Sequence, residues 1–240
     1  STQGVSSAAS DVYKRQHMVD VVLQFEGDRS YSFRVLRALK NRFGSTNESG
    51  IFSMEASGLQ EISNPAGLFL EERSNDASGS VVCACLEGNR PILVEVQALV
   101  AKTPYGMPRR TAVGFDYNRV TMLLAILERR LGMDFGAYDA YVNVVGGMRV
   151  TEPAADLAVA AALVSSYRNR PIPHGVLVMG EVGLTGEVRR IGSPERRIKD
   201  AMNLGFKRFV LPMGKLSLDE PCNGIVQVKT LEEALDKVFA

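Results

Sequence analysis

A connector rich in turn-forming and charged residues, residues 64–79, divides this chain of 240 residues into two parts. The shorter part, residues 17–63, contains apolar runs that are typical of β-strands, at residues 19–25, 31–39 and 51–54. Three strands bury too little apolar surface to fold alone. We therefore expect residues 17–63 to be the last strands of a larger sheet.

The longer part, residues 80–240, mixes strand and helix patterns without strict alternation, which predicts an α+β domain. Its clearest helix is at residues 116–131, where apolar residues recur at helical spacing and Asp116 is a suitable N-cap. A second helix is expected at residues 153–167, with Thr151 as its cap. The other predicted elements are strands at residues 80–86, 92–99, 141–145, 176–179 and 209–211, a helix from Ser193 that Gly205 ends, and a final helix opened by a capping box at Thr230 and Glu233.

The composition is that of an ordinary globular protein, with 45% hydrophobic residues, 23% charged residues and a net charge of +1. No apolar run approaches the roughly 20 residues that a membrane-spanning helix needs. Residues 1–16 are polar and aperiodic, so we expect a disordered tag or foreign leader there and a cytoplasmic protein. Cys83, Cys85 and Cys222 lack the spacing of a metal site, which predicts free thiols and no bound metal.

The segment Lys40-Asn41-Arg42-Phe43-Gly44 combines two cations, an aromatic side chain and a glycine at the end of the second apolar run. Cations placed where a strand gives way to a loop suit a bound anion, above all a phosphate. A solvated strand end without a ligand is the alternative that the spacing alone leaves open.

Together with the following Ser45-Thr46-Asn47-Glu48, this segment resembles the signature of the RadA (Sms) family of bacterial recombination and repair ATPases. The resemblance implies that residues 17–63 are the C-terminal strands of a RecA-like ATPase core. It implies ring-shaped homo-oligomers, hexamers in that family's manner, that act with a recombinase and drive branch migration on single-stranded and duplex DNA. Lys40, Asn41, Arg42, Phe43 and Gly44 would then couple the nucleotide of a neighbouring subunit to DNA. No phosphate-binding loop of the Gly-x-x-x-x-Gly-Lys-Ser/Thr type occurs here, so we expect no cofactor on this chain alone, and ATP with Mg²⁺ in the full-length family.

Residues 144–212 are similar to the proteolytic domain of Lon proteases, and residues 80–240 share that similarity more weakly. This resemblance implies a Lon protease-like domain of the ribosomal protein S5 domain 2-like fold. Ala154 stands at the position of the nucleophilic serine, and Arg197 at the position of the lysine base. Alanine has no nucleophile, and a guanidinium stays protonated near every working pH. We therefore expect no peptidase activity, and catalytic residues of the peptidase kind are absent.

Basic residues of the longer part form our candidate DNA-binding surface, because arginine and lysine contact phosphates without reading sequence. Arg119 is included because its charge in a first helical turn opposes the helix dipole. Solvated surface charges are the alternative interpretation. Two other functions also stay open: a Ser-Lys peptidase that does not need ATP, and a purely structural oligomerisation module. The candidates are Lys102, Arg109, Arg110, Arg119, Arg189, Arg190, Arg196, Arg197 and Lys199.

Overall fold

The computed structural model describes residues 19–26, 33–46, 49–55, 57–61, 77–104, 106–218 and 221–240. These residues form two compact units, and each unit is described by itself. The first contains β1 to β4 and is grouped with Glu87–Arg90, and the second contains the rest of the elements from β5 to α6. The predicted leader at residues 1–16 and most of the predicted linker at residues 64–79 lie outside the described residues.

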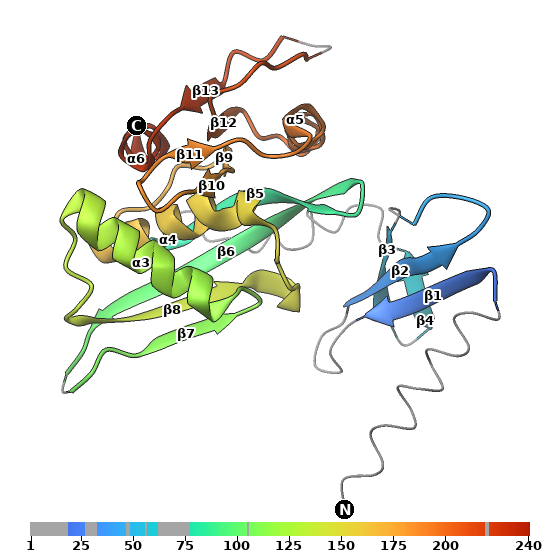
Figure 1. Cartoon of the computed structure of the whole chain (residues 1–240), viewed down its shortest axis with the longest axis horizontal. Coiled ribbons are helices and arrows are strands. Elements are labelled where there is room, and N and C mark those ends of the chain that lie inside the picture. Colours follow the sequence, from blue (N-terminus) through green and yellow to red (C-terminus); the bar gives the residue numbers. More distant parts are fainter. Residues whose placement is uncertain are drawn as a thin grey trace, which may run out of the picture. The chain divides into compact units, whose positions relative to one another are not determined.

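The first unit is a four-stranded antiparallel sheet of order β1-β2-β3-β4 (Figure 1). Its strands are Val21–Glu26, Phe33–Asn41, Ser49–Glu55 and Gly58–Glu61. The last strand, β4, was not predicted, because its four residues are largely exposed and show no apolar pattern in the sequence. Large apolar side chains on this sheet, among them Leu23, Phe25 and Met54, are exposed. Such exposure is typical of a sheet that packs against a further surface.

The second unit is built on a seven-stranded mixed sheet of order β13-β12-β9-β5-β6-β8-β7. The pairs β5–β9, β9–β12, β12–β13 and β7–β8 are parallel, whereas β6–β8 is antiparallel. A separate small ribbon joins β10 to β11. The predicted α+β class is confirmed. The strands are β5 Ser80–Glu87, β6 Arg90–Lys102, β7 Arg110–Val113, β8 Tyr138–Val144, β9 Val176–Val178, β10 Glu181–Val182, β11 Val188–Arg189, β12 Arg208–Pro212 and β13 Ile225–Val228.

Four α-helices accompany this sheet: α3 Tyr117–Leu131, α4 Asp156–Arg168, α5 Pro194–Asn203 and α6 Leu231–Phe239. Helix α4 is buried along most of its length and packs against α3 on one side and α6 on another (Figure 1). Ile198 and Ala201 of helix α5 pack in a core cluster with Leu177 and Phe209 of the sheet. Among the described residues, no helix is both long and apolar enough to cross a lipid bilayer.

Two predicted caps are confirmed and one is wrong. The Asp116 carboxylate accepts the backbone N–H of Arg119 at 2.8 Å, and the Thr230 hydroxyl accepts that of Glu233 at 3.2 Å. Thr151 does not cap α4, because the chain enters this helix through a 3₁₀ turn at Pro153–Ala155. That turn carries the Ala154 position into the interior.

Cys83 and Cys85 point to the same side of β5, because alternate residues of a strand share one face. Both thiols are buried, and their sulfur atoms lie 3.6 Å apart in a hydrogen bond. All three cysteines are free. Hydrogen bonding to Cys83, together with burial, raises the pKa of the Cys85 thiol well above its usual value. The Cys85 thiol is therefore an inert packing group at neutral pH.

Candidate functional site

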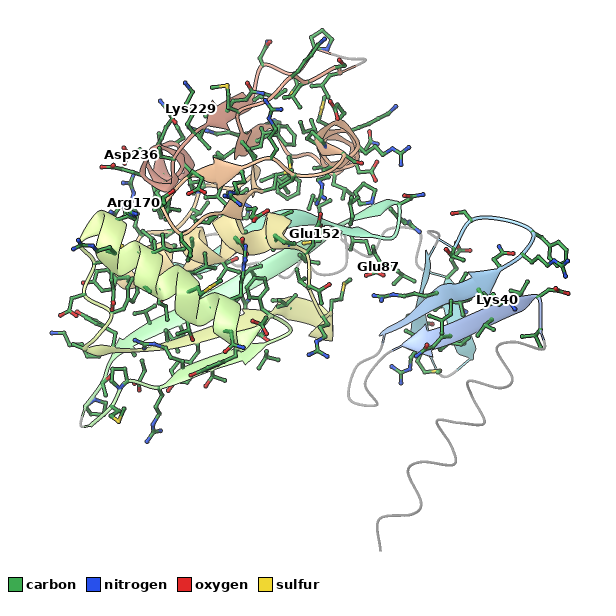
Figure 2. The ribbon with its side chains drawn as sticks, in the orientation of Figure 1. Lys40, Glu87, Glu152, Arg170, Lys229 and Asp236 are labelled. Carbon is green, nitrogen blue, oxygen red and sulfur yellow. The ribbon has the colours of Figure 1, made fainter. Side chains whose placement is uncertain are left out.

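The segment Lys40–Gly44 begins inside strand β2 and continues as a bend. Lys40 pairs with Val22 and Asn41 pairs with Val21 of β1, so the strand runs two residues beyond its predicted end at residue 39. Figure 2 shows Lys40 on this sheet. Only residues 42–44 form the turn itself.

Asn41 holds the bend in shape with its side-chain amide. Its Oδ1 accepts the Phe43 N–H at 3.1 Å, and its Nδ2 donates to the Ser45 carbonyl at 3.3 Å. Gly44 leaves room for this amide, because a Cβ there would lie 3.1 Å from Asn41 Nδ2. The asparagine amide therefore closes the turn, and the glycine lets this amide approach the backbone closely.

Arg42 and Phe43 are the parts of the bend that face solvent. The Arg42 backbone N–H donates to the Asp20 carbonyl at 3.0 Å, and its guanidinium donates to the Asp20 carboxylate at 3.0 Å. Its side chain nevertheless stays 74% exposed, and Phe43 is 79% exposed. A fixed backbone that presents a cation beside an exposed aromatic ring can bind an anionic ligand.

The Ala154 position lies in the 3₁₀ turn before α4 and is almost completely buried. Its carbonyl accepts the Gly180 N–H at 2.8 Å, while the Leu157 N–H donates to the Gly180 carbonyl at 3.0 Å. The turn is therefore tied by backbone bonds to the segment after β9. The methyl side chain offers no atom for covalent catalysis.

The Arg197 side chain is completely buried, and its hydrogen bonds are made to groups of the second unit. Its Nε donates to the Gly192 carbonyl at 2.8 Å, and its Nη1 donates to the Ala84 carbonyl at 2.5 Å. Nη1 also donates to Glu152 Oε2 at 3.0 Å, and Nη2 donates to Glu152 Oε1. The prediction that Arg197 contacts DNA is wrong, because a guanidinium without exposed surface cannot reach a phosphate.

Glu152 is the partner that makes this burial possible. It lies at the entrance to the 3₁₀ turn, two residues before Ala154 (Figure 2). Besides Arg197, its carboxylate accepts the Leu86 N–H at 2.7 Å. The pair therefore joins α5 to β5 and to the turn before α4. Buried charges persist only where they are paired and hydrogen-bonded in this way.

A second ion pair, between Arg119 and Asp156, lies at the start of α4. Arg119 Nε donates to Asp156 Oδ1 at 2.8 Å, and Nη2 donates to Oδ2. Asp156 also accepts the Val182 N–H of β10 at 3.1 Å. Burial raises the pKa of the Asp156 carboxyl even though these donors oppose the shift, and the hydrogen bond to Asp156 raises the pKa of Arg119. The ion pair with the buried Asp156 carboxylate explains why a cation stands in the first turn of α3. The Arg119 guanidinium is bound inside the unit, which corrects our interpretation of Arg119 as a DNA contact.

Arg189 belongs to the same charged network on its exposed side. Its Nε donates to Glu187 at 2.9 Å, and its Nη1 lies 3.9 Å from Glu181, which is also 4.0 Å from Arg119. Hydrogen bonds from Thr185, from the backbone and from Arg189 lower the pKa of Glu187 to about 2. Two carboxylates therefore offset the charge that Arg189 would offer to a phosphate.

The Arg110 guanidinium also donates its hydrogen bonds to groups inside the unit. Nη2 donates to the Phe135 carbonyl at 2.7 Å, and Nη1 donates to the Tyr138 carbonyl. Its neighbours Lys102 and Arg109 are exposed, and the base of their connection is fixed by Asp139, which accepts the Thr103 hydroxyl at 2.9 Å and the Arg109 N–H at 2.8 Å. These hydrogen bonds lower the pKa of Asp139.

The exposed basic candidates fall into two groups. Lys102 and Arg109 lie between β6 and β7, whereas Arg190, Arg196 and Lys199 lie around α5. Figure 1 shows β7 and α5 at separate ends of the second unit. The structure therefore does not join the predicted residues into one continuous basic surface.

Our reading of the sequence missed Glu152 and Asp156, which neutralise the two internal arginines. The signal was present, because these two acids bracket Pro153-Ala154-Ala155 at the start of an otherwise apolar helix. Acidic residues in such a segment are buried only with cationic partners. The fold and the site together define an α+β scaffold in which Glu152 and Asp156 hold Arg197 and Arg119 in ion pairs.

Comparison with known proteins places this scaffold in a family. Residues 97–215 match a family model described as subunit ChlI of Mg-chelatase, a match that runs from β6 to the segment after β12. The chain is 51% identical over 225 residues to the DNA repair protein RadA of Halalkalibacterium halodurans, covering 92% of this chain and 49% of that protein.

Two further relatives carry the same name. The RadA of Bacillus subtilis is 51% identical over 222 residues (92% of this chain, 48% of the relative), and that of Streptococcus pneumoniae is 49% identical over 228 residues (94% of this chain, 54% of the relative). The chain belongs to the RadA family. It spans about half the length of the curated relatives that it matches.

Proposed function

We propose that this chain serves DNA repair as part of a larger, ATP-driven protein, and that its second unit binds DNA and holds neighbouring subunits together without cleaving peptides. The relatives named DNA repair protein RadA support the biological role. The proposed architecture is a Lon-like domain that follows the last strands of a RecA-like core. Assembly into a ring of six subunits and cooperation with a recombinase belong to the same proposal.

The observation that carries the proposal is the buried pair of Arg197 and Glu152. A base must accept a proton from its nucleophile, and a guanidinium that is bound to a carboxylate and to two carbonyls has no capacity to do so. With Ala154 two residues from Glu152, the turn has neither reacting group. The Lon-like domain would then serve to bind DNA and to hold neighbouring subunits together.

In the first unit, we assign coupling to the bend that Asn41 holds. Arg42 and Phe43 project from this bend, which the hydrogen bond from the Arg42 N–H to the Asp20 carbonyl ties to the chain before β1, while the exposed Arg42 guanidinium is paired with the Asp20 carboxylate. A cation offered by one subunit to the γ-phosphate of its neighbour speeds hydrolysis in many ATPases. ATP and Mg²⁺ would be held by other parts of the assembly, because the sequence of this chain contains no Gly-x-x-x-x-Gly-Lys-Ser/Thr loop.

In the second unit, we assign DNA contacts first to Lys102 and Arg109. Both are exposed, and the connection that carries them is fixed at its base by Asp139. Arg190 adds an exposed cation near α5, where its Nε lies 3.4 Å from the Met213 carbonyl. Contacts of this kind position a protein on the phosphate backbone and read no sequence.

The test uses the full-length protein that contains this chain, with Lys40→Ala and Arg42→Ala as variants. DNA-stimulated ATP hydrolysis should fall by about 10³-fold, the usual effect of losing a cation supplied in trans. Branch migration should be lost with it, while the melting temperature of Arg42→Ala stays unchanged because the Arg42 side chain is exposed. Gln60→Ala, an exposed position on β4, is the control. Normal branch migration in both variants would contradict the assignment.

A further inference from the structure

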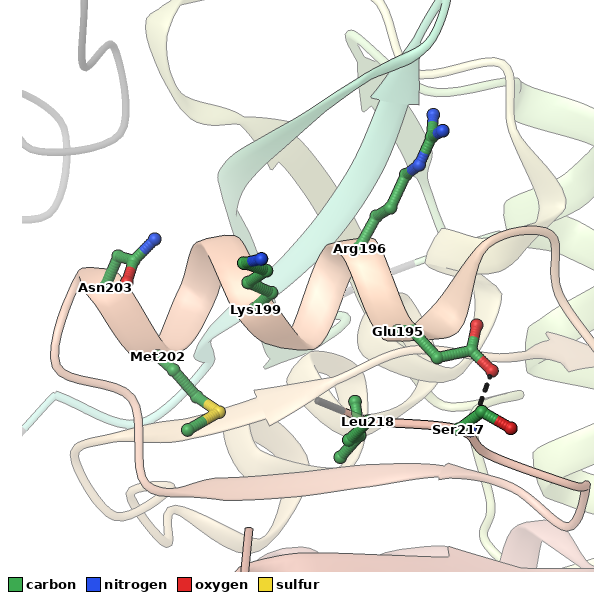
Figure 3. A pocket seen from close by; sticks show the side chains of 7 residues that line it. All are labelled: Glu195, Arg196, Lys199, Met202, Asn203, Ser217 and Leu218. Carbon is green, nitrogen blue, oxygen red and sulfur yellow. Dashed lines mark hydrogen bonds between the residues drawn. The ribbon is translucent and has the colours of Figure 1, made fainter. Parts of the chain in front are cut away.

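A groove of about 310 Å³ lies between α5 and the segment that follows β12 (Figure 3). Helix α5 contributes five of its lining residues, and the other side consists of Ser217 and Leu218. The groove is closed at one end by a hydrogen bond from the Ser217 N–H to the Glu195 carboxylate at 3.3 Å. The helix side is lined by Glu195, Arg196, Lys199, Met202 and Asn203.

The floor of the groove is apolar. Met202 and Leu218 pack against the core cluster that contains Ile198 and Phe209, so their positions are fixed, yet both side chains remain partly accessible. Figure 3 shows Met202 on the side of α5 that faces the segment after β12, and Leu218 on that segment. Methionine is a flexible, polarisable side chain that adapts to different apolar partners at binding surfaces.

The edge of the groove is basic. Arg196 and Lys199 are exposed and succeed one another along α5, with Asn203 one turn further on (Figure 3). A second hollow of about 210 Å³ shares Glu195 with the groove, and it adds Arg190 and Lys215 beside Leu216. Apolar contacts flanked by cations therefore continue past the closed end of the groove.

This combination favours a peptide over a nucleic acid. Proteins that bind single strands place aromatic side chains under the bases, and no lining residue that the structure describes at this groove is aromatic. The Glu195 carboxylate is an acceptor, and a peptide backbone offers N–H donors to it, whereas a phosphodiester backbone offers only acceptors. The Asn203 amide can pair with both N–H and C=O groups of a peptide.

We propose that this groove binds a short acidic peptide segment of a partner protein, with an apolar side chain of that segment resting on Met202 and Leu218. Carboxylates on either side of this anchor meet Arg196 and Lys199. An apolar anchor in a pocket with complementary charges around it is the usual arrangement of peptide recognition. The assignment goes beyond DNA repair as such and makes the second unit a docking site for a protein.

The experiment measures fluorescence anisotropy of labelled probes with the full chain. The first probe is a short peptide of aspartate and glutamate around a central Leu-Phe pair. The second probe replaces that pair by Gly-Ser, and the third is oligo-dT. The variants are Arg196→Glu with Lys199→Glu for the edge and Met202→Ala for the floor, with Lys237→Glu, an exposed cation on α6, as the matched charge control. Unchanged melting temperatures confirm that each variant folds.

Binding of the Leu-Phe peptide should weaken about tenfold or more in the double variant, because reversal replaces attraction by repulsion. It should weaken about fivefold in Met202→Ala through loss of apolar contact area, and change less than about twofold in the control. The Gly-Ser peptide should bind at least about tenfold more weakly than the first.

Two results would overturn the proposal. If no peptide binds and the edge variants lose oligo-dT binding, the groove is a DNA-binding site instead. Equal binding of both peptides would also overturn the proposal. A further variant, Lys102→Glu with Arg109→Glu, separates this proposal from the proposed function. It should lose DNA binding and keep peptide binding.

Discussion

Arg197 and Glu152 form a hydrogen-bonded ion pair inside the second unit, with Arg197 Nη1 donating to Glu152 Oε2 at 3.0 Å and Nη2 donating to Oε1. The arginine has no exposed surface, and about a quarter of the glutamate side chain is exposed. The pair joins α5, β5 and the turn before α4, which are distant in sequence. It occupies the place where the Lon resemblance puts a catalytic base.

Removing the carboxylate alone should destabilise the unit more than removing both charges. Glu152→Ala leaves the Arg197 guanidinium buried and uncompensated, which costs about 3 kcal/mol of unfolding free energy. Glu152→Leu combined with Arg197→Met removes both charges, and it should cost less than the single substitution. Urea denaturation measures both variants, with the exposed Glu128→Ala on α3 as control. A loss below about 0.5 kcal/mol in Glu152→Ala, the range of ordinary surface substitutions, would contradict a structural role of the pair.

Restoring the two residue types of the Lon resemblance should not restore peptidase activity. In Ala154→Ser with Arg197→Lys, the new amine would lie against Glu152, which favours its protonated form and withholds the base. We expect no turnover of a fluorogenic peptide. The triple variant that adds Glu152→Gly lacks this carboxylate, so comparing its turnover with that of the double variant isolates the effect of Glu152 on the new amine. Turnover by the double variant itself would show that Glu152 does not control the chemistry of the turn.

Arg119→Met should make stability depend on pH through Asp156. Burial raises the folded-state pKa of Asp156 above its ordinary 3.8, so its stabilising contribution is present at low pH and is lost as the pH rises through the folded pKa. Without Arg119 this pKa moves higher still, because the strongest opposing hydrogen bond is gone. The variant should lose roughly 2 kcal/mol more at pH 7 than at pH 4, since only the ionised carboxylate is left unpaired in the interior.

Urea denaturation at the two pH values checks this expectation, and Arg129→Met in the last turn of the same helix is the control. The control removes an exposed cation, so its effect should be small and equal at both pH values. An Arg119→Met variant that loses the same free energy at pH 4 and pH 7 would show that Asp156 does not depend on Arg119.

Elements that rest on local signals could be predicted from the sequence. Helix α3 begins after the Asp116 cap and α6 after the Thr230 cap, because each cap needs only residues within one turn of it. Strands β4, β10 and β11 could not be predicted, because two to four residues carry no periodic pattern and their pairing is decided by distant segments.

The site shows the same limit. The motif at Lys40–Gly44 and the loss of serine and lysine at Ala154 and Arg197 can be read directly from the sequence. The fate of each cation cannot be read in this way. Arg197, Arg119 and Arg110 look alike in sequence to Arg109 and Arg196, yet the first three bind internal carboxylates or carbonyls. Burial depends on tertiary packing, so charge counts overstate the surface that is open to DNA.

The most direct test of DNA binding without hydrolytic chemistry is a titration of labelled duplex DNA with the full chain at two salt concentrations. Binding should be clear at low salt and should fall steeply at the higher concentration, because each phosphate contact releases counterions. Lys102→Glu with Arg109→Glu should weaken it at low salt, while Lys237→Glu should not. Binding that is absent at low salt, or that does not change with salt, would contradict the proposed DNA-binding surface.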